Sequence, residues 1–111
     1  MAKNELVPGT LEMLVLKTLT LGSLHGYAIA QHIERTSGDA LKVEQGSLYP
    51  ALERLLNAGL VTAKWGQSPT GRKARYYTIT ASGRKKLGQE IEEFDAVSLA
   101  IARVLGREGA R

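Results

Sequence analysis

Apolar residues recur with helical periodicity in two stretches of the first forty residues. Residues 11–21 are almost continuously apolar, which predicts a buried central helix with Thr10 as its N-terminal cap. Residues 27–37 carry isoleucines four positions apart and end before Gly38, so we expect a second helix there. The link that follows, residues 40–44, alternates apolar and polar side chains, which indicates one short strand.

Residues 44–61 have the pattern of a third, amphipathic helix. Its apolar and polar residues separate onto opposite faces, with Leu48, Leu52, Leu55 and Leu56 on one and Pro50, Glu53, Arg54 and Asn57 on the other. A proline is tolerated best in the first turn of a helix, so Pro50 places the start near Gly46 or Ser47. Ser47 is then the expected N-cap, and Gly59 suits the C-terminal cap.

The start of this third helix exposes three side chains that can donate hydrogen bonds, those of Gln45, Ser47 and Tyr49. They lie at the positive end of the helix dipole, which can face a phosphate or a base edge. A short leucine-rich helix with a polar back is also what an ordinary core helix looks like. The neighbouring segments therefore decide between a recognition helix and a core helix.

Beyond Gly59 the residues favour strands. Residues 60–65 and 75–79 are rich in β-branched and aromatic side chains, and residues 66–73 between them have the glycine and proline of a loop. Three helices followed by such a hairpin predict a winged helix-turn-helix, a mainly α fold with a small β-hairpin, in residues 1–80. In that architecture the third helix enters the major groove, and the wing reaches phosphates or the neighbouring minor groove.

The last part of the chain, residues 81–111, is predicted to be a dimerisation helix. Thr80 is placed to cap it. A row of residues recurs along it at spacings of four and three: Leu87, Ile91, Phe94, Ser98, Ile101 and Leu105. A seam of this kind needs a partner, so we expect each tail to pack against its twin and against the first helix of the opposite subunit. The alternative is a tail that folds back on its own domain.

Composition supports a single domain with one appended helix. Of the 111 residues, 43% are hydrophobic and 23% are charged, and no apolar run reaches transmembrane length. The opening residues lack the apolar core of a signal peptide. Cysteine is absent, which leaves no disulfide, thiolate nucleophile or cysteine-based zinc site. We therefore expect a soluble, cytoplasmic protein with no membrane partner.

Positive charge is concentrated in one stretch. The formal net charge is +4, and residues 62–86 hold no acidic residue but contain Lys64, Arg72, Lys73, Arg75, Arg84, Lys85 and Lys86. An anionic partner is the natural inference, and a solvated basic face is the alternative. Arg72, Lys73 and Arg75 cluster at the return of the hairpin with no acidic neighbour to neutralise them. We expect these three cations to hold a phosphate backbone.

Motifs for catalysis, cofactors and metals are weak. The run from Ser82 to Lys85 matches a Ser-x-x-Lys nucleophile pattern. The match is weak evidence, because serine is expected at a helix start and the companion motifs are missing. His25, His32 and Glu34 could form a metal site, although a surface or capping histidine is the simpler interpretation. Neither a dinucleotide-binding glycine motif nor a P-loop occurs. We predict no enzyme, no catalytic residue, no metal site and no cofactor.

Three segments carry, in order, a resemblance to a known family: LVLKTLTLGSLHGYAIAQHIE, GSLYPALERLLNAGLV and GRKARYYTITASGRKKL. Over roughly residues 8–90 the chain resembles the PadR family of bacterial transcriptional regulators, in its short-tailed form with a single winged-helix domain. The resemblance implies a dimeric repressor, and some members of the family respond to phenolic acids or drug-like compounds. It also implies DNA binding by the wing cations and by Gln45, Ser47, Tyr49 and Pro50, to which we add Arg54.

The sequence thus predicts a DNA-binding transcriptional regulator, a homodimeric repressor relieved by an effector. Its double-stranded DNA operator should be an inverted repeat with half-sites about one helical turn apart, matching the two-fold symmetry of a dimer. A small aromatic effector is the further expected partner; Trp65 and the tyrosines either line its pocket or simply pack, and such a pocket is expected mainly at the dimer interface. The alternative is a winged-helix module that binds protein or small anions without reading DNA.

Overall fold

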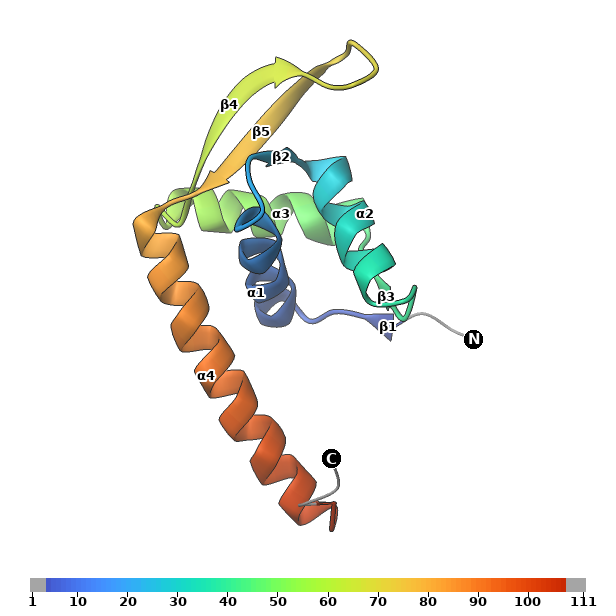
Figure 1. Cartoon of the computed structure of the whole chain (residues 1–111), viewed down its shortest axis with the longest axis vertical. Coiled ribbons are helices and arrows are strands. Elements are labelled where there is room, and N and C mark those ends of the chain that lie inside the picture. Colours follow the sequence, from blue (N-terminus) through green and yellow to red (C-terminus); the bar gives the residue numbers. More distant parts are fainter. Residues whose placement is uncertain (1–3, 108–111) are drawn as a thin grey trace.

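The computed structural model describes residues 4–107 of the chain. Residues 1–3 and 108–111 lie outside the described residues. They are the first residues of the predicted winged helix-turn-helix, 1–80, and the last of the predicted dimerisation helix, 81–111. Residues 1–3 are also half of the opening stretch on which the signal-peptide prediction rests. The elements in chain order are β1 (Asn4–Glu5), α1 (Pro8–Leu19), β2 (Leu24–His25), α2 (Gly26–Thr36), β3 (Leu41–Lys42), α3 (Gln45–Asn57), β4 (Val61–Gln67), β5 (Lys73–Ile79) and α4 (Ala81–Val104). Figure 1 shows the β4–β5 hairpin standing above α3 and the long α4 leaving the opposite side.

The core forms around α1, which contacts α2, α3, β5 and the start of α4. Its fully buried side chains come from every helix of the domain and from the first strand of the hairpin, and they include Leu11, Val15, Leu16, Leu19, Ile29, Leu48, Leu52, Leu55 and Val61. Within α1 and α3 they recur three and four positions apart, because that spacing places them on one face. The three predicted helices and their apolar faces are confirmed.

Two predicted N-caps are wrong. The α1 helix begins at Pro8, with Val7 as N-cap, because a proline at the first helical position gives up only an amide that has no intrahelical partner. Thr10 therefore lies inside the helix. The N-cap of α3 is Glu44, whose carbonyl accepts hydrogen bonds from the amides of Ser47 and Leu48 at 3.0 and 2.9 Å. Ser47 is thus a first-turn residue.

The wing is longer than predicted and is part of a three-stranded antiparallel sheet in the order β2-β5-β4. Its register runs from Val61 opposite Ile79 to Gln67 opposite Lys73, so the loop is confined to residues 68–72. The short β2 was not predicted, because two residues between glycines have no pattern of their own. The strand expected within residues 40–44 is present as β3, which pairs in parallel with β1.

A tight joint fixes where α4 leaves the domain. The hydroxyl of Thr80 accepts a hydrogen bond from the amide of Gly83 at 3.0 Å and donates one to the carbonyl of Gly59 at 2.8 Å, which confirms Thr80 as the cap. Gly59 has φ 74°, as expected of a helix C-terminal glycine. A Cβ at Gly83 would lie 2.1 Å from the carbonyl oxygen of Leu60, so only glycine allows this close approach.

Beyond the joint, α4 changes from a core helix into an exposed one. Leu87, the first member of the predicted row, is buried in the core of its own domain. The later large apolar members of the row are all exposed in the single chain: Ile91, Phe94, Ile101 and Leu105. Figure 1 shows this half of α4 standing clear of the other helices. Among residues 4–107, no helix combines the length and the hydropathy that a bilayer span requires.

Candidate nucleic-acid interface

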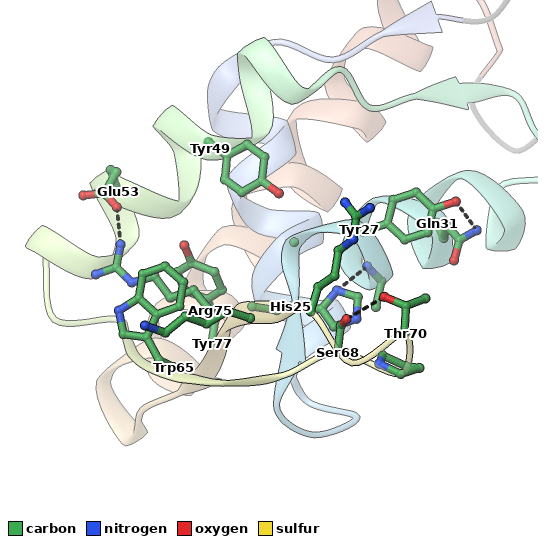
Figure 2. A pocket seen from close by; sticks show the side chains of 16 residues that line it. His25, Tyr27, Gln31, Tyr49, Glu53, Trp65, Ser68, Thr70, Arg75 and Tyr77 are labelled. Atoms are coloured by element: carbon green, nitrogen blue, oxygen red, sulfur yellow. Dashed lines mark hydrogen bonds and ion pairs between the residues drawn. The ribbon is translucent and has the colours of Figure 1, made fainter.

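A cleft of ≈ 890 Å³ opens between the wing, the start of α2 and the exposed face of α3. Figure 2 shows how side chains from these three elements face one another across it. The residues that carry its chemistry are Tyr27 of α2, Tyr49 and Glu53 of α3, and Trp65, Lys73 and Arg75 of the wing. We expected such a hollow mainly between two subunits, whereas a single chain already forms it.

The face of the wing that lines the cleft continues the buried face of the sheet. Alternate residues of a strand point to the same side, so Trp65 lies on the side of the buried Val61, and Arg75 on that of the buried Ile79. The hairpin extends beyond the core, and its outer residues have no core to enter. Trp65 is consequently 61% exposed and faces the cleft instead of packing inside.

Among the α3 residues predicted to bind DNA, Tyr49 is the one that lines the cleft, with 43% of its surface exposed. Its ring rests against the backbone at the start of α2. A Cβ at Gly26 would lie 2.8 Å from the Tyr49 hydroxyl oxygen and 2.9 Å from Cε1, so the ring occupies the space that any other residue at position 26 would fill. The absence of a side chain at Gly26 thus sets the position of Tyr49.

The other predicted residues of α3 are distributed over two surfaces. Gln45, Ser47 and Pro50 are exposed near the start of the helix, but they do not line the cleft. Arg54 points toward α1, where its Nε donates to the carboxylate of Glu12 at 2.5 Å. This ion pair ties α3 to α1 and withdraws Arg54 from the cleft, an arrangement that separation into polar and apolar faces could not reveal.

The wing cations differ in their neighbours. We expected none of them to have an acidic partner, and for Arg75 that was wrong, because its Nη1 lies 3.0 Å from Oε2 of Glu53. The acid comes from α3, outside the acid-free stretch of sequence on which the expectation rested. Within residues 4–107, no carboxylate forms an ion pair with Arg72 or Lys73, and the Lys73 ammonium lies 5.5 Å from the centroid of the Trp65 ring.

Tyr77 forms the floor beneath Arg75, whose guanidinium carbon lies 5.8 Å from the ring centroid. Burial raises the pKa of Tyr77 above its ordinary value, against the opposing effect of Arg75. The phenol therefore stays neutral at physiological pH and adds no negative charge beneath the cations. Glu53 is then the one acidic residue among those that line the cleft.

The two histidines weighed for metal binding have structural contacts, and the serine weighed for catalysis is exposed. The Nδ1 of His25 accepts a hydrogen bond from the amide of Ala28 and caps α2, as the simpler interpretation predicted. His32 is hydrogen-bonded to Thr36 on the next turn. Ser82 lies exposed in the first turn of α4. In the part of the chain that the structure describes, no three histidine or acidic side chains gather as metal ligands.

Comparison with known proteins agrees with this geometry. Residues 15–89 match the transcriptional regulator PadR-like family. The chain is 29% identical over 77 residues to the negative transcriptional regulator PadR of Bacillus subtilis, covering 69% of this chain and 42% of that protein. A transcriptional regulator from Clostridium thermocellum is similar in structure, with TM-score 0.79 and 26% identity over 86% of this chain and 92% of that one. A PadR family regulator from Eggerthella lenta has TM-score 0.75 and 27% identity, covering 87% and 82% of the two chains. This chain belongs to the PadR-like family of transcriptional regulators.

Proposed function

We propose that the protein is a homodimeric repressor that binds double-stranded DNA, with α3 in the major groove and the wing on the adjacent phosphates. The observation that carries this proposal is the cleft, where Tyr49 shares one surface with Arg72 and Lys73, two wing cations that form no ion pair with a carboxylate of residues 4–107. Gln45, Ser47 and Pro50 are also exposed near the start of α3, Ser47 beside Leu6, Leu11 and Val43 and not at the cleft, and Arg75 contributes from the wing. Repression agrees with the name of the Bacillus subtilis relative, a negative transcriptional regulator.

The exposed half of α4 supports the dimer part of the proposal. Phe94 is 49% exposed, and the large apolar residues that follow it on the same face are exposed as well among the described residues of the single chain. A face of this kind is unfavourable in water, and a second copy of the same helix covers it by two-fold symmetry. Two recognition helices then read an inverted repeat, which one short helix cannot distinguish among the sites of a genome. A chromosomal operator also implies a cytoplasmic protein.

The effector part of the proposal rests on the aromatic lining of the cleft. Tyr27, Tyr49 and Trp65 present exposed rings around a hollow large enough for a small aromatic molecule. A ligand held among these rings would occupy the surface that DNA needs. Binding of the effector and binding of DNA would then exclude each other, which is the behaviour of an inducer.

Salt dependence tests the proposed function. We expect the logarithm of the affinity for a duplex of about 30 base pairs to fall linearly with the logarithm of the salt concentration, because phosphate contacts release counterions. Arg72 and Lys73 from both subunits would neutralise several phosphates, so the slope should be negative with a magnitude of at least about 3 to 4. Fluorescence anisotropy measures it. A chain that binds no duplex, or binds one without dependence on salt, fits the protein-interaction alternative and contradicts the proposal.

Tyr49 and Gly26 provide a second prediction. We expect Tyr49→Phe to weaken duplex binding with the fold intact, because a hydrogen bond to a charged phosphate contributes roughly 1.5 to 3 kcal/mol. Gly26→Ala should also weaken binding, because its methyl group displaces the Tyr49 ring. In a Tyr49→Ala background the same change should add no further loss. Duplex titrations of the four variants, with circular dichroism for the fold, measure these effects.

The matched control is Gly88→Ala in α4, where an added methyl group meets open space. It should bind DNA as the wild type does. If Tyr49→Phe binds normally while Tyr49→Ala unfolds the domain, Tyr49 is a packing residue. Equal losses from Gly26→Ala in both backgrounds would show that Gly26 acts independently of the ring.

A further inference from the structure

Glu53 places a negative charge on the surface that the proposed function assigns to DNA. Glu53 lies one turn after Tyr49 on the exposed face of α3, and its side chain is 52% exposed. Its carboxylate is 3.0 Å from the Arg75 guanidinium of the wing (Figure 2). A negative charge at this position opposes phosphate binding and also engages one of the cations that would attract a phosphate.

The surroundings of the ion pair between Glu53 and Arg75 allow Arg75 to leave Glu53 and bind a phosphate. Both side chains are partly exposed, so water screens the attraction between the two charges and the ion pair is weak. The guanidinium also lies against the ring of Tyr77, a contact that it can keep while its N–H groups turn from the carboxylate to a phosphate. Arg75 can therefore bind either Glu53 or the DNA backbone.

We propose that Glu53 is a specificity-determining residue that weakens binding to random DNA more than binding to the operator. The inference rests on the proposed DNA-binding function. Binding to random sequence consists almost entirely of phosphate contacts, so the full effect of the carboxylate counts against it. In the major groove a glutamate accepts a hydrogen bond from the N4 amino group of cytosine. A DNA site with a cytosine opposite Glu53 regains, through this hydrogen bond, the affinity that the carboxylate costs. A site without that cytosine does not regain it.

Glu53→Gln tests this inference, since it removes the charge and keeps the shape. On a random-sequence duplex of about 30 base pairs at roughly 0.1 M salt, we expect binding about threefold tighter or more, with a salt slope steeper by about one per subunit. On a duplex recovered by selection from a random library with the wild-type protein, the gain should be smaller or reversed. The ratio of the two affinities should therefore fall.

Arg75→Gln separates the contributions of the two partners. In the wild-type background it should weaken random-duplex binding, because it removes a cation that can turn to a phosphate and leaves the Glu53 carboxylate without its partner. In the Glu53→Gln background it should remove much of the gain, because the arginine is then free to contact phosphate. The matched control is Glu90→Gln in α4, which removes the same charge from another ion pair, the one with Lys86 at 3.4 Å, away from the cleft.

The outcomes distinguish this inference from the function on which it rests. If the wild type binds neither duplex, the proposed function itself fails. If the wild type binds and Glu53→Gln leaves random-duplex affinity unchanged or lower, this inference is overturned. It is also overturned if Glu90→Gln gives the same gain, or if Glu53→Gln tightens both duplexes equally.

Discussion

The variant Ile91→Asp with Phe94→Asp is expected to sediment as a folded monomer and to lose most of its operator affinity. Both residues lie on the exposed face of α4, beyond the part that belongs to the core, so the change does not reach the domain itself. In a dimer joined through this face, the change would bury unpaired charges at a cost of several kcal/mol. Loss of the second recognition helix then removes the affinity that two half-sites provide.

A matched control places the same two charges on the opposite side of the helix. Gln89 and Ala96 are exposed and lie roughly 160° to 180° around α4 from the centre of the apolar face, at 100° per residue. Gln89→Asp with Ala96→Asp should remain a dimer and bind normally. Analytical ultracentrifugation and a duplex titration measure both variants. A double variant that stays dimeric, or that binds undiminished as a monomer, would show that α4 is not the dimerisation element.

Arg72→Ala with Lys73→Ala is expected to weaken binding to operator and random DNA alike, by at least about tenfold at low salt, because phosphate contacts are shared by all sequences. The salt slope should fall by about one for each phosphate that the variant no longer neutralises. Arg84→Ala with Lys85→Ala is the control, since it removes the same charge from the first turns of α4, outside the cleft. Equal losses from both pairs would indicate a general charge effect, and unchanged binding would falsify the assignment of the wing.

Local signals in the sequence were sufficient for most of the fold. The spacing of leucines and isoleucines predicts α1 to α3, because a helix that packs against a core must bury every third or fourth residue. Thr80 and Gly59 are predictable as caps, because capping involves only neighbours in sequence. Thr80 caps α4 through its hydroxyl, and Gly59 ends α3 through a positive φ that glycine adopts readily. The change from helical to alternating pattern after Gly59 predicts the hairpin.

The features that were missed depend on residues far apart in the chain. Arg54 reaches Glu12 across 42 positions, and Arg75 reaches Glu53 across 22, so neither pairing leaves a pattern within one element. The exposure of Trp65 follows from the length of the hairpin relative to the core, a three-dimensional property. Tyr49 is predictable as an exposed residue near the start of α3, but the space at Gly26 that holds its ring is visible only once α2 is packed.

Because α4 is long and joins the domain only at its start, near Thr80 and Gly83, a small rotation at this joint moves its far end a long way. At 1.5 Å per residue its 24 residues span about 36 Å, so a rotation of about 10° at the joint displaces the far end by about 6 Å. In a dimer held through that far half, as proposed, the same rotation turns each winged domain about the joint, and α3 moves in proportion to its own distance from the joint rather than to the length of α4. The close contact between Gly83 and the Leu60 carbonyl therefore fixes the angle between α4 and the rest of the domain. Under the proposed function, the angle at this joint would set the distance between the two α3 helices of a dimer, at a place remote from every side chain that would touch DNA.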